Sequence, residues 1–174
     1  MLLQLDLSWL KLHPKETQKF HLSESADKLG LSFEGFRFVD DVDCDLTVTN
    51  TGKLLVSEGT LAVTVEAGCA RCLKPVREAF SIPFSVEFCA EENRPDFEGE
   101  ESFVYFTEPQ INMADIISET VLVNLPLRFL CQDDCRGLCA ACGADLNIGE
   151  CGCVKDEIDP RWEALKQMMK GKEG

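Results

Sequence analysis

The sequence predicts an α+β fold: an antiparallel sheet or partly closed barrel with one packed helix, followed by a small cysteine-rich tail and a short C-terminal helix. Three segments alternate apolar and polar residues with the two-residue period of a half-buried strand. A fourth segment repeats apolar residues at helical spacing over about 113–124, and six cysteines crowd into residues 131–153. A chain of 174 residues can bury one core and a satellite module. We therefore expect two domains, a sheet domain over 1–126 and a tail over 127–174.

The predicted strands begin after an irregular N-terminal region. Residues 1–42 mix leucine and phenylalanine with many charges in an imperfect period, and we expect short strands and loops there. The inward-facing residues of the three regular strands are Cys44, Leu46 and Val48, then Leu61, Val63 and Val65, then Ile82, Phe84, Val86 and Phe88. A turn over 50–52 joins the first two strands, which predicts an antiparallel meander. Pro83 has no amide hydrogen to donate, so the last strand should lie at a sheet edge.

An acidic segment follows the third strand. Residues 91–101 carry six carboxylates, one arginine, one proline and one glycine, a composition typical of a solvated loop. A docking site for a basic partner is the alternative. Residues 103–106 should then return to the sheet.

Two helices are expected in the last third of the chain. Asn112 should cap a helix over about 113–124, and Pro126 ends it because proline disfavours helical backbone in the preceding residue. Asp159 should cap a second helix. The apolar face of that helix would hold Trp162, Leu165 and Met169. Such a face either packs on the rest of the chain or docks on another macromolecule.

The formal net charge is −14 at pH 7. A surface of that sign repels nucleic acid at long range and attracts a basic protein, so RNA binding would require a local basic patch. The first residues lack the basic start of a signal peptide, and no apolar run reaches the roughly 20 residues that cross a bilayer. We therefore expect a cytoplasmic protein without membrane contact, and a reducing compartment favours ligands or buried thiols over disulfides.

Four cysteines of the tail have the spacing of a metal site. Cys139 and Cys142 enclose two residues, Cys151 and Cys153 enclose one, and nearby glycines allow the tight turns. Sulfurs held about 2.3 Å from one point would form a tetrahedral, all-thiolate zinc site. We therefore predict a zinc-stapled tail. An iron-sulfur site with the same ligands and a disulfide cluster are the alternatives.

A second cysteine group begins at a predicted hairpin tip. Cys69 and Cys72 enclose Ala-Arg there, and they form half of a second zinc site if Cys131 and Cys135 complete it. Two alternatives stay open for this group: a redox dithiol whose thiol pKa is lowered by neighbouring cations, and free thiols. The two remaining cysteines lie in predicted strands and would be ordinary buried residues.

The candidate RNA-binding residues lie beside this second group. The hairpin tip would project Arg71, Lys74 and Arg77 together, with Arg136 near them if Cys135 joins the same metal. A solvated set of charges is the alternative. Motifs of nucleotide-binding proteins, zinc proteases and serine hydrolases are absent from the sequence. Because zinc with four thiolates has no open position for water, we expect a non-enzyme without a small-molecule substrate.

The tail is similar to that of a known bacterial family. Its signature string comprises Leu125-Pro126, Cys131, Cys135-Arg-Gly-Leu-Cys139-Ala-Ala-Cys142-Gly143, Asp145-Leu-Asn147, Cys151-Gly-Cys153 and Asp159-Pro-Arg161. Together with Cys69-Ala-Arg-Cys72-Leu73, this string resembles the YceD family over roughly residues 44–169. The resemblance implies a large ribosomal RNA subunit accumulation protein, needed for normal levels of 23S ribosomal RNA, and it implies no catalytic residues. Plants have plastid relatives, and the family's gene commonly lies beside that of a small large-subunit ribosomal protein.

The resemblance and the charge pattern lead to one expected function. We expect a non-catalytic factor that supports 23S ribosomal RNA accumulation and large ribosomal subunit assembly. Its partners would be 23S ribosomal RNA in an assembly intermediate, a basic large-subunit ribosomal protein, or both. The alternative from another class is a thiol redox or metal-handling protein that uses Cys69 and Cys72.

Overall fold

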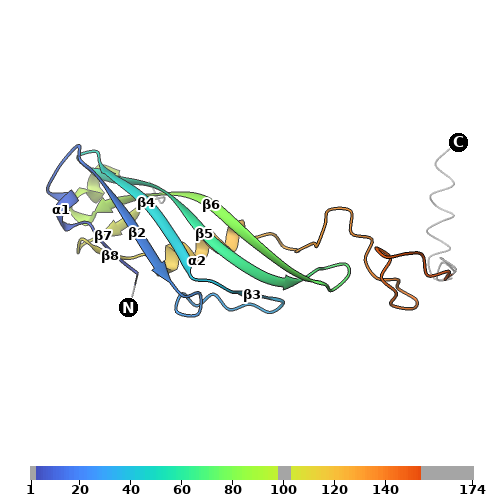
Figure 1. Ribbon diagram of the computed structural model, residues 1–174. Helices are drawn as coiled ribbons and strands as arrows, with labels where there is room; N and C mark the ends of the chain where they lie inside the picture. Colours follow the sequence, from blue (N-terminus) through green and yellow to red (C-terminus); the bar gives the residue numbers. More distant parts are fainter. Residues whose placement is uncertain (1–2, 98–102, 154–174) are drawn as a thin grey trace, which may run out of the picture.

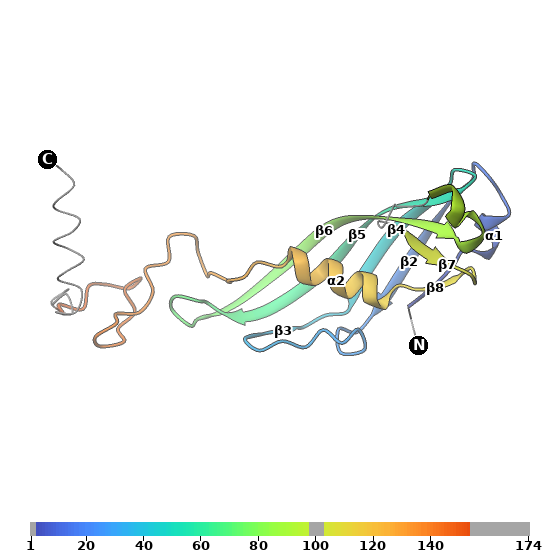
Figure 2. The same ribbon diagram turned by 180° about the vertical axis from the view of Figure 1, so that it is seen from behind.

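The computed structural model describes residues 3–97 and 103–153. It consists of a twisted main sheet with one helix lying along one of its faces and a separate, two-stranded antiparallel sheet formed by Gln4–Asp6 and Gln110–Asn112 (Figures 1 and 2). The strands are β1 (Gln4–Asp6), β2 (Thr17–Glu24), β3 (Phe36–Phe38), β4 (Val42–Asn50), β5 (Leu54–Gly68), β6 (Pro75–Ala90), β7 (Val104–Phe106) and β8 (Gln110–Asn112). The helices are α1 (Ser8–Lys11), the 3-10 helix η1 (Glu91–Phe97) and α2 (Ala114–Asn124). In the described ranges, no helix is long and apolar enough to cross a membrane.

The main sheet has the strand order β2-β4-β5-β6-β7, and β3 pairs with β5 beyond the end of β4. Its neighbours are antiparallel except β6 and β7, which run parallel. The predicted antiparallel meander is therefore confirmed for β4, β5 and β6. Residues 104–106 return to the sheet as expected, but as β7 they pair parallel to β6, so the antiparallel pattern does not extend to this strand. Within the described residues the sheet is open, with β2 and β7 at its ends, so a partly closed barrel does not form.

The strands β5 and β6 form a long hairpin that pairs along its whole length. Pro83 pairs with Thr60 on one side, whereas β7 pairs on the other side only with residues 88–90. The expectation that this strand lies at a sheet edge is therefore wrong for β6 as a whole, because β7 continues the sheet. At Pro83 itself, however, the described strands supply a partner on one side only, which suits a residue without an amide hydrogen. The tip of the hairpin, residues 69–74, carries the first two cysteines of the candidate site toward the tail.

The core lies between one face of the sheet and the helices. The predicted alternation is confirmed in β4, where inward residues are buried and outward residues are exposed or half-buried. Ile117 of α2 and Leu10 of α1 are fully buried against this face, and each such side chain contributes about 1.5–3 kcal/mol of hydrophobic stabilisation. Among the described residues, two polar side chains are buried, and both are hydrogen-bonded. Asn50 donates to the Leu10 carbonyl oxygen at 2.7 Å, and Ser57 donates to the Val86 carbonyl oxygen at 2.7 Å.

The span of helix α2 agrees with the sequence-based expectation, but its N-cap residue is Met113, one position after the expected Asn112. The helix begins at Ala114 and ends at Asn124, within one residue of the predicted start and at the predicted end. The side chain of Asn112 accepts a hydrogen bond from the Ala114 amide at 3.1 Å, so it satisfies one of the free donors at the helix start. The second predicted helix, after Asp159, lies outside the described residues.

Two segments are more regular than their sequence patterns predict. Within residues 1–42, β2 is an eight-residue strand paired along its length with β4, and α1 is a short helix that was not predicted. The alternation in β2 is weak because none of its side chains is fully buried at this edge of the sheet. The first part of the predicted acidic loop forms η1, where Arg94 pairs with Glu91 and lies over the Tyr105 ring.

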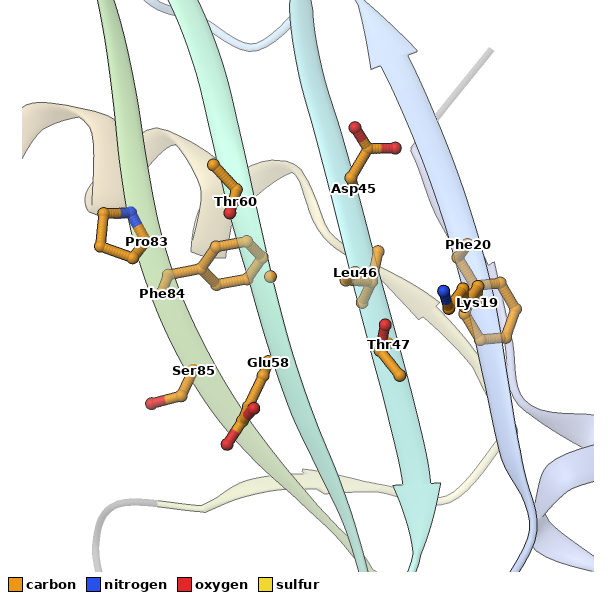
Figure 3. Close-up of a pocket in the computed structure, with 11 residues that line it drawn as sticks. Lys19, Phe20, Asp45, Leu46, Thr47, Glu58, Thr60, Pro83, Phe84 and Ser85 are labelled. Atoms are coloured by element: carbon orange, nitrogen blue, oxygen red, sulfur yellow. The ribbon is translucent and has the colours of Figure 1, made fainter.

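The face of the main sheet opposite α2 contains a hollow of about 920 Å³ (Figure 3). It crosses the middle of β2, β4, β5 and β6. The outward-pointing residues that line it are Lys19, Asp45, Thr47, Glu58, Thr60, Pro83 and Ser85. The hollow is therefore lined by hydroxyl groups, two carboxylates and a single lysine, which lies on β2 at one side of it (Figure 3).

Candidate metal centres

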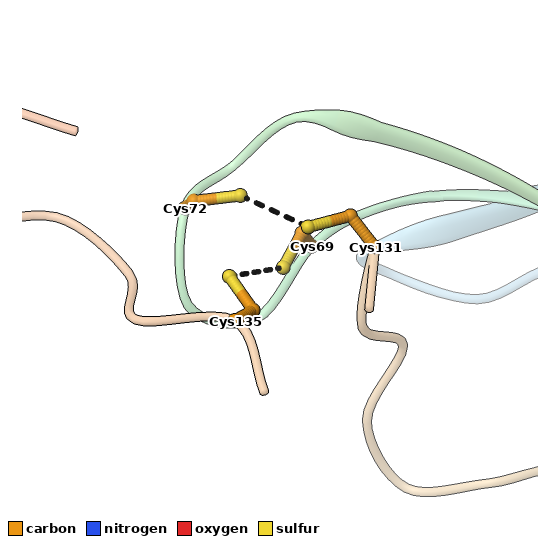
Figure 4. A group of neighbouring side chains, drawn as sticks. All are labelled: Cys69, Cys72, Cys131 and Cys135. Atoms are coloured by element: carbon orange, nitrogen blue, oxygen red, sulfur yellow. Dashed lines mark hydrogen bonds between the residues drawn. The ribbon is translucent and has the colours of Figure 1, made fainter. Parts of the chain in front are cut away.

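The first cysteine group joins the hairpin tip to the tail. Cys69 and Cys72 come from the connection between β5 and β6, and Cys131 and Cys135 come from the tail after α2 (Figure 4). Their four sulfur atoms lie within 4.8 Å of one another. The Sγ atoms of Cys69 and Cys135 are 3.8 Å apart, and those of Cys72 and Cys131 are 3.5 Å apart. The structure thus brings together the four residues that the sequence grouped.

Local backbone contacts explain why these four sulfurs converge. The Cys69 amide donates to the Lys74 carbonyl oxygen at 2.7 Å, and this bond closes the hairpin tip. Leu73 supplies the sharp bend there with a φ of +62°, an uncommon conformation for a residue with a side chain. Phe129 is buried beside Val65 and accepts the Ala70 amide hydrogen at 2.8 Å, so the tail is anchored just before its first cysteine.

The second group is built within the tail alone. The sulfurs of Cys139, Cys142, Cys151 and Cys153 also lie within 4.8 Å of one another. The Cys139 amide donates to the Ala144 carbonyl oxygen at 2.8 Å, and the Gly143 amide donates to the Cys139 carbonyl oxygen at 2.8 Å. Gly143 has a φ of +74°, which glycine adopts without strain. This tight turn is the arrangement that the Cys-x-x-Cys-Gly spacing predicts.

The thiols of the first group differ in acidity. Burial opposes ionisation of Cys69, but hydrogen bonds from the backbone amides of Arg71, Cys131 and Cys72 lower the pKa of the Cys69 thiol to about 6. The hydrogen bond with Cys72, followed by burial, raises the pKa of Cys131 to about 12. The Cys69 thiol therefore ionises readily, whereas ionisation of the Cys131 thiol in the same group is strongly disfavoured.

The second group repeats this division. Hydrogen bonds from the backbone amides of Cys142 and Ala141 lower the pKa of Cys139 to about 6. Hydrogen bonds with the neighbouring thiols, first that of Cys142, raise the pKa of Cys153 to about 12. Four crowded thiolates repel one another unless a cation lies between them. Each group could therefore hold a metal ion, and binding would release the remaining thiol protons.

The remaining cysteines lie apart from both groups. Cys44 and Cys89 are fully buried in β4 and β6, as the sequence predicts. Burial, followed by the charge of Asp45, raises the pKa of Cys44 to about 12. All ten cysteines are free thiols, so the disulfide alternative is not the arrangement in this structure.

Three of the four candidate RNA-binding cations lie where the hairpin tip meets the tail. Arg71 donates through Nη1 to the carbonyl oxygens of Asp133, at 3.2 Å, and Cys135, at 2.8 Å. Lys74 Nζ lies 2.8 Å from Asp145 Oδ2. Arg71 and Lys74 thus hold the tail, a role that the sequence did not reveal.

The other two cations form pairs that are more exposed. Arg77, on β6, lies 2.9 Å from Asp40. Arg136 lies 3.7 Å from Glu150. The structure therefore brings together Arg71, Lys74 and Arg136, and it gives each of the four cations a protein partner.

Two residues that the sequence analysis named only within the family string, without a role, connect the cysteine groups. Asp145 and Asn147 lie in the loop between Cys142 and Cys151, and both contact the hairpin tip or its neighbouring tail segment. An Asp-x-Asn sequence in a tight loop indicates local side-chain to backbone hydrogen bonds. It does not indicate which distant atoms the same side chains reach.

A family model covers the residues that form both groups. The model described as large ribosomal RNA subunit accumulation protein YceD matches residues 57–169. The chain belongs to the YceD family. The match begins in β5 and includes the hairpin tip, α2 and all eight clustered cysteines.

Curated relatives of this YceD family member come from bacteria and a plant. An uncharacterised protein of Mycobacterium tuberculosis is 33% identical over 129 residues, 74% of this chain and 62% of the relative. A protein of Mycobacterium leprae is 28% identical over 146 residues, 83% of this chain and 67% of the relative. The Arabidopsis thaliana large ribosomal RNA subunit accumulation protein YCED homolog 1, chloroplastic, is 27% identical over 192 residues, 88% of this chain and 60% of the relative. The chain thus spans about 62% of the length of the relatives from Mycobacterium bovis and Mycobacterium tuberculosis. No solved structure matches it significantly.

Proposed function

We propose that this chain is a non-catalytic factor that supports accumulation of 23S ribosomal RNA during assembly of the large ribosomal subunit. Its membership of the YceD family is the observation that carries the proposal. Each cysteine group offers four thiols, so a tetrahedral cation bound there has no open position for water or substrate. The protein would act in the cytoplasm, where bacteria assemble ribosomes, by binding components of an assembly intermediate.

We propose zinc as the metal in both groups. Four thiolates around one point are a common ligand set of structural zinc, and a Cys-x-x-Cys turn supplies two of the four in each group here. An iron-sulfur cluster uses the same ligands, but it absorbs visible light whereas zinc thiolates do not. A colourless purified protein that contains zinc, measured by elemental analysis, would support this assignment. A brown protein that contains iron and sulfide would refute it.

A basic ribosomal protein is the partner class that the charges favour. The net charge is −14, and the carboxylates of Asp45 and Glu58 line the hollow on the open sheet face with Lys19 as its single lysine. Carboxylates on this face would attract lysine- and arginine-rich segments and speed their association. In this arrangement the factor reaches ribosomal RNA through the protein that it carries.

Direct RNA contact through Arg71, Lys74, Arg77 and Arg136 is the second candidate. These cations lie in the part of the chain that matches the family, and exposed ion pairs contribute only about 0–1 kcal/mol, so phosphate can replace a carboxylate partner. Arg71 and Lys74 also hold the tail, and changing them would disturb the cysteine groups. Arg77 and Arg136 are therefore the informative positions for an RNA test.

Thiol redox chemistry or metal handling at Cys69 and Cys72 is the alternative from another class. The lowered pKa of Cys69 is the observation that favours it. Trapping of thiol states in growing cells separates the classes. Reversible oxidation of these two cysteines would favour the redox role, whereas stable protection by a bound metal would favour the structural role.

Crosslinking in cells, followed by identification of bound RNA and protein, tests the proposed function. We expect crosslinks to a basic large-subunit ribosomal protein that are lost when Asp45 and Glu58 are both changed to lysine. The Arg77→Glu and Arg136→Glu double variant tests direct RNA contact, with Arg37→Glu as a matched control on β3. A cell lacking the protein should also contain less 23S relative to 16S ribosomal RNA. A normal ratio, with no crosslinked ribosomal component, would refute the function.

A further inference from the structure

The loop of the second cysteine group bonds directly to a sulfur of the first. Asn147 lies between Cys142 and Cys151, yet its Nδ2 lies 3.5 Å from Cys135 Sγ and donates a hydrogen bond to it. Its Oδ1 accepts the Arg136 amide hydrogen at 2.8 Å. One side chain therefore fixes both the sulfur of Cys135 and the backbone that follows it.

An ion pair makes a second connection between the groups. Asp145 Oδ2 lies 2.8 Å from Lys74 Nζ, two residues beyond Cys72 on the hairpin tip. Asp145 Oδ1 accepts hydrogen bonds from Asn147, from the backbone amide at 2.9 Å and from Nδ2 at 2.8 Å. The carboxylate side chain is 15% exposed, so this pair is better shielded from solvent than the other pairs at the tip. Asp145 thus positions Asn147 while it holds the hairpin tip.

Backbone hydrogen bonds form a third connection through residues 137–138. The Leu138 amide donates to the Arg71 carbonyl oxygen at 3.1 Å, on the hairpin tip. The Leu146 amide donates to the Gly137 carbonyl oxygen at 2.9 Å, in the second loop. The two cysteine groups therefore share one hydrogen-bonded network, with residues 137–138 between them.

The second loop has little other source of order. None of residues 139–153 is buried, so apolar packing contributes little to holding this segment in place. A metal bound by its four sulfurs would order it, because binding free energy in such modules acts as folding free energy. The ordered loop is what places Asn147 and Asp145 against the first group.

We propose that the two cysteine groups bind zinc as one coupled unit, with Asn147 and the Lys74–Asp145 pair as the positioning residues that connect them. This inference rests on the proposed zinc assignment but not on any role with ribosomal RNA. Filling the second group presents the Asn147 amide to the Cys135 thiolate, and a hydrogen bond to a metal-bound thiolate favours its charged form. By thermodynamic linkage, zinc in the first group must favour binding in the second by the same factor.

Native mass spectrometry of the full-length protein during zinc removal by a chelator tests the coupling. When two independent sites hold one zinc per molecule on average, at least half of the molecules carry exactly one, whatever the two affinities are. Coupled sites instead leave mainly molecules with two zinc ions and molecules with none. We expect the one-zinc form to stay well below half at this midpoint. A one-zinc form at or above half would overturn the proposal that the two groups load as one unit, because the coupling would then not outweigh the difference between the two affinities.

Two variants with matched controls locate the connection. Asn147→Ala should lower zinc affinity of the first group about 10- to 100-fold, the usual effect of losing a residue that orients a metal ligand. Lys74→Gln should have a smaller effect, and in both variants the one-zinc form should rise to half or more. Asn124→Ala removes an exposed side-chain hydrogen bond on α2, and Lys53→Gln breaks the distant ion pair with Asp96. Both control variants should leave the distribution of zinc-bound forms unchanged.

The readout separates this inference from the proposed function. A wild-type protein that lacks metal altogether would overturn the zinc assignment and the coupling together. Coupled zinc loss in a protein that crosslinks to no ribosomal component would leave the coupling standing and remove only the ribosomal role. Because the wild-type distribution alone decides whether the two groups load as one unit, the test holds even if a variant folds poorly.

Discussion

Gly137 lies directly against the carbonyl oxygen of Arg71. A Cβ atom at Gly137 would come within 2.9 Å of that oxygen, and the residue has a φ of +76°. The next residue, Leu138, donates its amide hydrogen to the same oxygen at 3.1 Å. The tail therefore docks on the hairpin tip backbone to backbone, at a point where only glycine fits.

Gly137→Ala should loosen this docking. The left-handed conformation alone costs about 1–2 kcal/mol for a residue with a side chain, and the contact with Arg71 adds to it. Hydrogen exchange of the Leu138 amide should become faster. Gly30→Ala is the control, because Gly30 has a φ of +70° with no atom within 4 Å and bears only the conformational cost. Equal losses of stability in the two variants would show that the close approach is unimportant.

Metal removal should change the reactivity of eight cysteines and leave two unchanged. A metal-bound thiolate is shielded from alkylation, so the clustered cysteines should react with iodoacetamide at pH 8 only after chelation. Cys44 and Cys89 should stay unreactive in both states, because they are buried and burial raises both thiol pKa values, that of Cys44 to about 12. Mass spectrometry of peptides counts the labels. Labelling of all eight clustered cysteines without chelator would contradict metal binding.

Cys142→Ser should loosen the tail and leave the sheet folded. The main core lies between the sheet, α1 and α2, and no residue of the second cysteine group belongs to it. Hydrogen exchange should therefore rise in residues 127–153 while core amides such as that of Leu61 keep their protection. Cooperative unfolding of the whole protein, seen by circular dichroism, would show that tail and sheet form a single folding unit instead.

The pKa of His21 should be raised by Asp45. Their side chains meet at 2.7 Å on the open sheet face, and this hydrogen bond, together with the carboxylate charge, raises the pKa above 6.5. Stabilisation from a raised pKa is fully present below 6.5 and is lost as the pH rises through the folded-state value. In Asp45→Asn, an NMR titration should return the His21 pKa toward 6.5. Asp43→Asn, which removes a weaker charge contribution, should lower it less.

Gly59→Ala should destabilise the sheet. An added Cβ would lie 2.7 Å from the Asp45 carbonyl oxygen and 2.7 Å from Cε1 of Phe84, so the strands must shift. Overpacking of this kind typically costs about 1–3 kcal/mol, which urea unfolding can measure. Gly68→Ala, in the same strand, meets its nearest atom at 3.9 Å and should be close to neutral. Similar unfolding midpoints for the two variants would contradict this prediction.

Several features of this protein could be predicted from the sequence because local patterns encode them. Alternation of apolar residues places β4 and the inward residues of β5 and β6, since successive side chains in a strand point to opposite faces. Helical spacing and Asn112 locate α2. The Cys-x-x-Cys turn with Gly143 is equally local. Once four tail cysteines are assigned to one site, the two cysteines of the hairpin tip and the two remaining tail cysteines make up the second group.

Other features depended on the tertiary structure, because they join residues that are distant in sequence. The parallel pairing of β7 depends on how the chain crosses after β6, and the length of β2 depends on the edge that β4 offers. The sequence indicates no protein partner for the cations at the hairpin tip. In the structure, packing of the tail gives Lys74 the carboxylate of Asp145 and gives Arg71 two carbonyl oxygens. The amide of Asn147 reaches the sulfur of Cys135 for the same reason. Residue spacing encodes each turn, whereas the register of the tail on the hairpin decides which atoms of different turns meet.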